Sequence, residues 1–202
     1  MYCVGLTGGI ASGKSTVSAL LSKMGARLID ADVVARSAVA AGSPAWQAIV
    51  ERFGQEILLQ DGSLNRGMLG GKIFAEPALR NWLDALTHPA IRQEIFRQMQ
   101  LAREEDCRLL VLDIPLLIEA GWREFVDEVW VVYVRPDVQL NRLMERNILS
   151  REQALQRIQS QMSLEEKVGY ADLVIDNNAG LEELEKQVSD AWRRLQNKVT
   201  AI

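Results

Sequence analysis

The stretch that decides the fold is Gly8-Gly-Ile-Ala-Ser-Gly13-Lys14-Ser15, which matches the pattern G-x-x-x-x-G-K-[ST] at every position. The apolar run Tyr2–Leu6 precedes it and predicts a buried β-strand. Residues 14–24 follow it with a helical pattern, and Gly25 is well placed to end that helix. A glycine-rich turn between a strand and a helix is the setting in which this pattern binds phosphate. The sequence therefore predicts a phosphate-binding loop (P-loop) at residues 8–15.

The residue types of this loop suit the phosphate chain of a nucleotide. Glycines let successive backbone N–H groups point inward, beside a helix N-terminus that carries partial positive charge. Lys14 is expected to reach the β- and γ-phosphates of ATP, and the Ser15 hydroxyl is expected to ligate Mg²⁺. The loop residues predicted to bind ATP are Gly9, Ile10, Ala11, Ser12, Gly13, Lys14, Ser15 and Thr16.

Composition excludes several classes of protein. The 202 residues are 48% hydrophobic and 25% charged, which is typical of a folded globular chain and not of a disordered one. A net charge of −4 argues against general nucleic-acid binding. The longest apolar stretch, residues 109–118, is too short to span a bilayer, and the N-terminus lacks the basic flank of a signal peptide. Cys3 and Cys107 are expected to be buried thiols, which fits the cytoplasm.

The order of predicted elements indicates an α/β fold. Short apolar runs at 27–29, 109–112, 129–134 and 173–175 predict strands, and they alternate with helical patterns such as 137–146 and 181–197. Strands that are apolar throughout indicate a parallel sheet covered on both faces. The block 33–105 interrupts this alternation and is predicted to be a helical insertion, with helices at 33–41, 44–53, 66–74, 77–86 and 89–104.

Carboxylates follow two of the predicted strands. Asp30 and Asp32 follow residues 27–29, and alternation along the strand sends both to the same side. Either one is a candidate to face the P-loop, while an ordinary turn in which Asp32 caps the next helix explains the spacing equally well. Asp113 follows 109–112 in the manner of a carboxylate that holds Mg²⁺ through water. Open parallel sheets bind their ligands at this edge.

A second group of polar residues lies between positions 137 and 170. Gln139, Arg142 and Arg146 are spaced i, i+3 and i+7, so they share one face of a predicted helix. Two capping boxes, Ser150 with Gln153 and Ser163 with Glu166, predict the starts of two further helices. Helices that present arginines in a nucleotide-binding protein suggest a mobile lid, and the alternative is a solvated charged face.

The P-loop alone does not distinguish a kinase from a regulatory nucleotide-binding module. A regulatory GTPase needs Asn-Lys-x-Asp and Asp-x-x-Gly motifs, but Asn197-Lys-Val-Thr200 lacks the aspartate and no Asp-x-x-Gly occurs. A small-molecule kinase needs a carboxylate to take the acceptor proton and arginines to bind phosphates, and both have candidates here. The pattern favours a kinase, with a nucleoside monophosphate or a sugar acid as alternative acceptors.

Several further strings together resemble the dephospho-CoA kinase family. They occur in family order from residue 2 to about residue 180: Gly5-Leu-Thr-Gly-Gly-Ile-Ala-Ser-Gly-Lys-Ser-Thr16, Ile29-Asp-Ala-Asp32, Asn65-Arg66 before Phe74, His88-Pro-Ala-Ile-Arg92, Pro115-Leu-Leu-Ile-Glu119, Gln139-x-x-Arg142-x-x-x-Arg146 and Ala171-Asp-x-x-Ile-Asp-Asn177. The resemblance implies transfer of the γ-phosphoryl group of ATP to the 3′-hydroxyl of dephospho-CoA. The products are CoA and ADP, in the final step of coenzyme A biosynthesis.

The resemblance also implies an architecture, the P-loop NTPase three-layer sandwich with a parallel five-stranded sheet. Residues 1–32, 106–136 and 171–202 are expected to form its nucleotide-binding core and residues 33–105 a helical CoA-substrate domain. Residues 137–170, here named the lid segment, are expected to form a short helical lid. The expected partners are ATP and dephospho-CoA, with Mg²⁺ as cofactor. Nothing in the sequence indicates a nucleic acid, a membrane or an obligate protein partner.

Site residues follow from the resemblance position by position. Asp32 is expected to be the catalytic base, assisted by Lys14, and Arg142 and Arg146 are expected to clamp phosphates. The remaining expected ligands are Arg142 and Asn177 for ATP, Ser15 and, through water, Asp113 for the metal, and Asp32, Arg66, His88, Arg92, Leu116 and Glu119 for the substrate. Ala11 departs from the family, which usually has glycine there. We expect Ala11 to adopt φ below zero and nucleotide binding to be retained.

Overall fold

The computed structural model describes residues 1–200, apart from the side chains of Phe74 and Ala75. The chain divides into two compact units. The first contains residues 1–29 and the chain from residue 102 onward, and the second contains residues 30–101. The second unit is therefore inserted into the first in sequence, between strands of one sheet.

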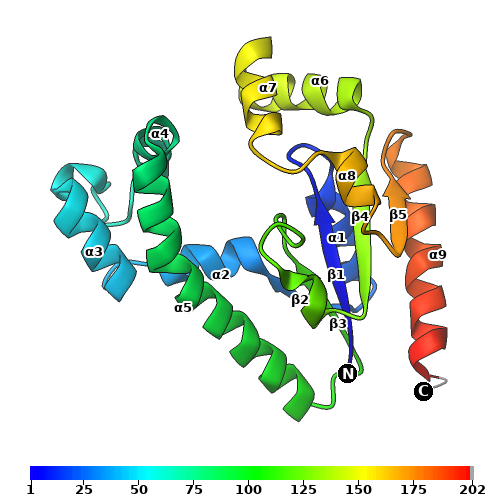
Figure 1. Ribbon diagram of the computed structural model, residues 1–202. Helices are drawn as coiled ribbons and strands as arrows, with labels where there is room; N and C mark the ends of the chain where they lie inside the picture. The colour runs from blue at the N-terminus through cyan, green and yellow to red at the C-terminus, as the bar shows by residue number, and fades with distance from the viewer. Residues whose placement is uncertain (201–202) are drawn as a thin grey trace. The chain divides into compact units, whose positions relative to one another are not determined.

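A five-stranded parallel sheet forms the centre of the first unit, as predicted (Figure 1). Its strand order is β2-β3-β1-β4-β5. The bounds are Tyr2–Gly8 for β1, Arg27–Asp30 for β2, Leu109–Asp113 for β3, Glu128–Tyr133 for β4 and Leu173–Asp176 for β5. The first strand lies between β3 and β4, with Leu6 opposite Asp113 and Gly8 opposite Val132. The P-loop and Asp113 therefore leave the sheet at the same edge.

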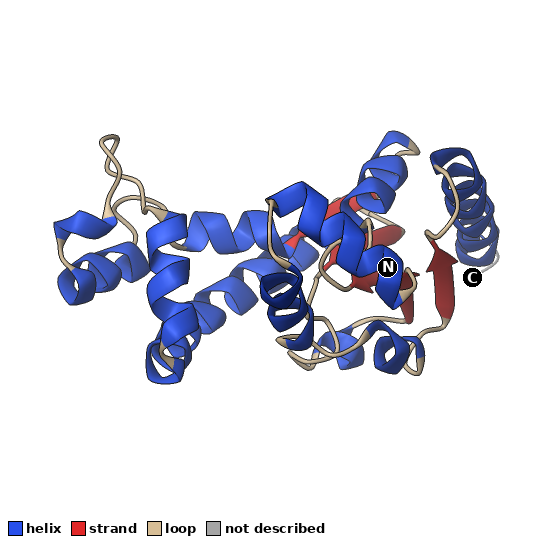
Figure 2. Cartoon of the chain, turned by 90° about the horizontal axis from the view of Figure 1, so that it is seen from above, coloured by secondary structure: helices blue, strands red, loops and turns tan. Residues whose placement is uncertain are grey.

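Two helices, α1 (Lys14–Lys23) and α9 (Leu181–Thr200), cover one face of this sheet. The buried side chains of α9 recur at helical spacing and pack with those of α1 against the strands. Figure 2 shows the helix that ends at the C-terminus beside the outermost strand, β5. Gly25 ends α1 as predicted: its φ is 87°, and Ala26 N–H donates to the Leu21 carbonyl.

The opposite face is covered by residues 114–126, including the short helix η2 (Trp122–Phe125), and by α8 (Leu164–Val168). Gly5 has no side chain because a Cβ atom there would overlap Leu117 and press on Val126. The lid segment begins with α6 (Pro136–Asn147) and α7 (Arg151–Gln159). Both predicted capping boxes, at Ser150 and Ser163, are present.

The second unit is helical. Its elements are α2 (Ala31–Ala38), α3 (Pro44–Phe53), η1 (Gln55–Ile57), α4 (Arg66–Ala75) and α5 (Pro77–Glu104), whose last turn belongs to the first unit. Ile49, Ile57, Leu64 and Leu69 form its buried core. Trp82 packs at the edge of this core, with its ring 5.9 Å from that of Phe53.

Several local expectations were wrong. Residues 77–86 and 89–104 form one helix, because Pro89 removes only a single backbone hydrogen bond and the turns on both sides continue. The alternative in which Asp32 caps α2 is also wrong, because Asp30 caps this helix and accepts hydrogen bonds from the N–H groups of Asp32 and Val33. That helix also ends at Ala38 and does not reach residue 41. The expectation of buried thiols is confirmed for Cys3, where burial raises the pKa to about 12, and is wrong for Cys107, which is free but only partly buried.

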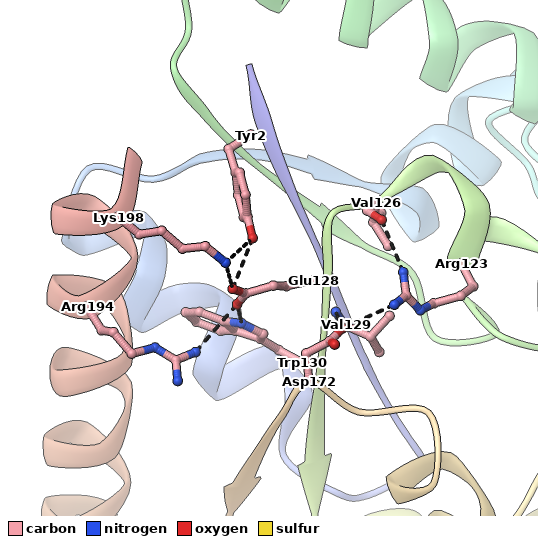
Figure 3. A network of polar contacts seen from close by, with 9 residues as sticks. All are labelled: Tyr2, Arg123, Val126, Glu128, Val129, Trp130, Asp172, Arg194 and Lys198. Atoms are coloured by element: carbon pink, nitrogen blue, oxygen red, sulfur yellow. Dashed lines mark hydrogen bonds and ion pairs between the residues drawn. The ribbon is translucent and has the colours of Figure 1, made fainter. Parts of the chain in front are cut away.

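Glu128 organises a polar network at the sheet edge opposite the P-loop (Figure 3). Its carboxylate is about one-tenth exposed and accepts hydrogen bonds from Trp130 Nε1 and Tyr2 Oη, both at 3.0 Å. Lys198 and Arg194 of α9 approach it at 2.6 and 3.4 Å. The network therefore joins the two ends of the chain across the sheet. No helix within residues 1–200 has both the length and the hydropathy to cross a bilayer.

Candidate active site

The P-loop is held by backbone geometry and by one asparagine. Gly13 caps α1 with φ 91°, and a Cβ atom on it would overlap the side-chain amide of Asn177. Asn177 Nδ2 donates to the Ser12 carbonyl at 2.8 Å, and its own backbone N–H donates to the Tyr133 carbonyl. Asn177, a predicted ATP ligand, therefore fixes the turn of the loop through buried contacts.

Lys14 and Asp113 form an ion pair in this structure. Asp113 is 2% exposed and also accepts a hydrogen bond from the hydroxyl of Ser18, one turn further along α1. The register of β1 and β3 explains the pairing, because Asp113 lies opposite Leu6, just before the loop. The structure thus brings together two of the predicted residues, and Ser18 is a partner that the sequence analysis missed.

Two serines of the loop have different environments. Ser15 is exposed at the start of α1, so its hydroxyl is accessible to a ligand. Among the described side chains, Ser12 Oγ is a buried polar atom without a hydrogen-bond partner. A buried hydroxyl in this condition is costly, which is typical of a site completed by a bound group.

Ala11 differs from the expectation, because its φ is 61° and not below zero. An alanine in the left-handed region costs roughly 1–2 kcal/mol. Its methyl group packs in an apolar cluster with Ile10 and with Leu140, Leu143 and Ala154 of the lid segment. This packing offsets the backbone strain.

The lid segment is anchored on the P-loop at its base. Gln139 Nε2 donates to the Ile10 carbonyl at 2.8 Å, and Gln161 Oε1 accepts from the Ile10 N–H at 3.0 Å. Arg142 is half-buried and donates to the Asn177 carbonyl at 3.1 Å. Arg146 is exposed and bonds to the side chain of Asn147 at 2.9 Å. Of the two predicted phosphate clamps, Arg142 therefore contacts the asparagine that holds the loop, and Arg146 contacts its own neighbour on the helix.

Glu119 and Leu116 lie in the segment that follows β3. Leu116 is 37% exposed. The carboxylate of Glu119 contacts Lys167 at 2.9 Å and accepts from the Met162 N–H at 3.2 Å. Glu119 is thus bonded to the lid segment through two groups.

Four predicted residues belong to the second unit. Asp32 is exposed in the first turn of α2, and Arg66 is exposed at the start of α4, where it donates to the Arg36 carbonyl at 3.3 Å. His88 and Arg92 are exposed on α5. His88 Nε2 lies 3.5 Å from the Asp84 carboxylate, and the Arg92 guanidinium lies 5.8 Å from the ring of Phe96.

A family model described as Dephospho-CoA kinase matches residues 2–183 of this sequence. The chain belongs to the dephospho-CoA kinase family. Membership assigns it to the ATP-dependent kinases. The resemblance proposed from the quoted motifs is therefore confirmed.

Individual relatives agree with the family model. A dephospho-CoA kinase from Symbiobacterium thermophilum is 49% identical over 96% of this chain and 81% of its own length. One from Geobacter metallireducens is 48% identical over 96% of each chain. Among solved structures, TT1252 from Thermus thermophilus gives a TM-score of 0.77 at 34% identity, covering 96% of this chain and 97% of its own. Dephospho-CoA kinase from Campylobacter jejuni gives a TM-score of 0.74 at 29% identity, and the match covers 97% of this chain and 98% of that one. These two likenesses confirm the α/β P-loop fold.

Some residues of this dephospho-CoA kinase family member were missed from the sequence. Ser18 and Lys167 contact predicted site residues, but each looks like an ordinary helix residue. Lys167 lies in the last turn of a short helix, where a lysine is expected to be solvated, and its partner Glu119 is 48 residues away in sequence. Only the tertiary structure reveals such contacts.

Proposed function

We propose that this chain transfers the γ-phosphoryl group of ATP to the 3′-hydroxyl of dephospho-CoA and releases CoA and ADP. The observation that carries the proposal is a complete P-loop, with Lys14 beside Asp113, in a chain that belongs to the dephospho-CoA kinase family. We further propose residues 1–32, 106–136 and 171–202 as the nucleotide-binding core and residues 33–105 as the substrate domain. The lid segment, residues 137–170, is proposed as a mobile lid.

The P-loop supplies the binding of the phosphate chain. Inward N–H groups of residues 9–16 and the N-terminus of α1 favour the negative charge of the β- and γ-phosphates. Lys14 binds these phosphates when its ion pair with Asp113 is replaced by contacts with the nucleotide. Arg142, which contacts Asn177 behind the loop, supplies a second cation. Preorganised charges of this kind stabilise the transition state because they need no rearrangement during the reaction.

The donor set at the loop fits Mg²⁺. The accessible hydroxyl of Ser15 and the carboxylate of Asp113 are the oxygen ligands that this ion prefers, and both lie at the loop. Within the described residues, no three His, Cys, Asp or Glu side chains gather at one point, and Mg²⁺ commonly completes its shell with water and phosphate. When bound, Mg²⁺ neutralises charge that develops on the phosphates.

Asp32 is proposed as the group that accepts the proton of the acceptor hydroxyl. Its carboxylate is exposed, and Asp30 performs the capping of α2, so Asp32 has no capping role in this structure. A hydrogen bond from the 3′-hydroxyl to this carboxylate would orient the nucleophile and then remove its proton. Arg66, His88, Arg92, Leu116 and Glu119 are proposed to contact the acceptor.

The test is release of ADP by the purified chain with ATP, Mg²⁺ and one acceptor at a time. Dephospho-CoA should support turnover, and AMP, gluconate or water should not. The product should be CoA, identified by its mass and by the position of the added phosphate. Equal ADP release without any acceptor would contradict a kinase function, and turnover with AMP or gluconate alone would identify a different acceptor.

A further inference from the structure

Lys167 is a buried charged residue to which the proposed reaction assigns no role. Its side chain is fully buried, and it is one of the largest fully buried side chains among the described residues. Burial lowers the pKa of Lys167, and the contact with Glu119 opposes that shift. A buried ammonium is costly unless it is both paired and hydrogen-bonded. Lys167 has both kinds of partner: Nζ donates to the Pro115 carbonyl at 2.8 Å and lies 2.9 and 3.1 Å from the two oxygens of Glu119.

These partners lie at a junction of three elements. Lys167 belongs to α8 in the lid segment, and Pro115 and Glu119 belong to the segment that leaves β3 after Asp113. The Pro115 carbonyl also accepts a hydrogen bond from the hydroxyl of Thr7, in β1, at 2.9 Å. The ammonium therefore joins the end of β1, the segment after β3 and the base of the lid segment.

The electrostatics of this junction concern the phosphate site. Lys14 is close enough for its charge to contribute to the lowered pKa of Lys167. Glu119 contributes a negative charge beside Lys167, and its side chain is 23% exposed. Without Lys167, this carboxylate would oppose any anionic group that binds beside it.

We propose that Lys167 is a positioning residue, which holds Glu119 against the base of the lid segment and neutralises the charge of its carboxylate. The segment after β3 then binds an acceptor molecule that carries a diphosphate. This inference rests on the proposed function, in which Glu119 and Leu116 contact dephospho-CoA. Lys167 therefore affects binding of the anionic acceptor, and binding of ATP by the P-loop depends on Lys167 only weakly.

A double-mutant cycle tests the charge relation. Lys167→Met should raise KM for dephospho-CoA by at least ~10-fold, because the Glu119 carboxylate then faces the anionic acceptor without a counter-charge. KM for ATP should change less than ~3-fold. Lys167→Arg should restore most of the loss. In Lys167→Met combined with Glu119→Gln the repulsion is absent, so KM for dephospho-CoA should fall back toward the wild-type value. An unchanged acceptor KM in Lys167→Met, or a double variant no better than Lys167→Met, would overturn the proposal.

Glu119→Gln alone keeps the test decisive if Lys167→Met does not fold. It breaks the ion pair from the other side and leaves the buried Lys167 ammonium without its charged partner. Limited proteolysis within residues 148–162 should therefore be faster in Glu119→Gln than in the wild-type protein. Cleavage at the wild-type rate would overturn the proposal that this pair holds the base of the lid segment.

Lys198→Met is the matched control, because it removes another lysine that pairs with a mostly buried glutamate, at the sheet edge opposite the P-loop. It should lower the melting temperature without changing either KM. A non-kinetic measurement separates this inference from the proposed function: limited proteolysis within residues 148–162 should be faster in Lys167→Met than in Lys198→Met. Wild-type protein that does not turn over dephospho-CoA would contradict the proposed function alone, while equal cleavage rates would contradict the role of Lys167.

Discussion

At the scale of single residues, the pairing of Lys14 with Asp113 links the stability of the loop to its chemistry. Asp113 is almost fully buried, and Ser18 also donates to it, so the carboxylate keeps a partner when Lys14 is removed. The ion pair holds the Lys14 side chain at the phosphate edge of the sheet. Loss of Lys14 should therefore affect turnover much more than folding.

The corresponding variant is Lys14→Ala. We expect kcat for CoA formation to fall at least ~10²-fold, the scale of losing one preorganised electrostatic group. Circular dichroism should show an intact fold, and Lys23→Ala, which changes an exposed lysine of the same helix, serves as the control. Near-normal turnover in folded Lys14→Ala would contradict the role assigned to the P-loop.

Asp32→Asn tests the proposed base. The substitution keeps the shape of the side chain and removes its charge, and the cap of α2 is preserved because Asp30 provides it. We expect kcat to fall ~10²–10⁴-fold, with ATP affinity nearly unchanged. Substantial recovery with higher Mg²⁺ or with Mn²⁺ would assign Asp32 to the metal shell, and full activity would exclude both roles. Asp190→Asn, at an exposed ion pair of α9, is the control.

Ala11 provides a test of backbone strain in the loop. Ala11→Gly relieves the left-handed conformation but removes a packed methyl group, and these effects are of similar size, about 1 kcal/mol each. The melting temperature of Ala11→Gly should therefore change little, and ADP binding by calorimetry should be retained. Ala11→Val should be clearly less stable, because a β-branched residue is rarely found with this φ. Equal stability of the two variants would show that φ at this position is not constrained.

At the scale of elements, the two arginines of α6 differ in what they contact. Arg142 lies against the P-loop through the Asn177 carbonyl, whereas Arg146 extends from the exposed end of the helix. Arg142→Ala and Arg146→Ala should both lower kcat with little change in melting temperature, because neither side chain belongs to the apolar cluster of the lid segment. Large losses of melting temperature with unchanged kinetics would assign these arginines to structural roles.

The same elements show what could be predicted from sequence. Capping boxes, the P-loop and the glycine that ends α1 depend on residues a few positions apart, and all were predicted correctly. The continuous helix through Pro89 was not predicted, because its stability depends on the turns on both sides of the proline. The φ of Ala11 was also missed, because the packing that offsets its strain involves residues more than a hundred positions away.

The candidate site divides in the same manner. Lys14 and Asp113 were predicted to lie at one edge of the sheet because their motif and strand end are visible in the sequence, and the structure pairs them. Ser18 contacts Asp113 and Lys167 contacts Glu119, but a hydroxyl or an ammonium on a helix carries no signal of what it will contact. Sequence analysis therefore finds groups of known chemistry more readily than the residues that hold them in position.

At the scale of the whole molecule, the Glu128 network contributes pH-dependent stability. Burial raises the pKa of Glu128, but hydrogen bonds from Lys198, Trp130 and Tyr2 outweigh it, and the pKa lies below the ordinary value of 4.5. Its stabilising contribution is therefore complete above that value and is lost as the pH falls through the lower pKa of the folded protein.

Glu128→Gln measures this contribution. At pH 7 the variant should be less stable than wild type by about 1–3 kcal/mol, the range for hydrogen bonds to a charged group. Chemical denaturation at pH 3 should show a smaller difference, because pH 3 lies below the ordinary pKa of 4.5 and the unfolded wild-type chain then binds a proton at Glu128. Glu51→Gln, at an exposed position of α3, should show no such dependence on pH. A difference that is constant from pH 7 to pH 3 would contradict the assignment.

The position of β1 in the sheet has a consequence for the order in which the protein is made. Tyr2 pairs with Leu109 and Val4 with Glu128, so β1 is synthesised more than a hundred residues before either of its neighbours. Throughout that interval an apolar strand and its attached P-loop remain without a sheet, while the helical residues 30–101 are completed. Pairing between such distant segments is slow to form. Newly made chains therefore carry β1 as an exposed, aggregation-prone segment until synthesis has passed β4.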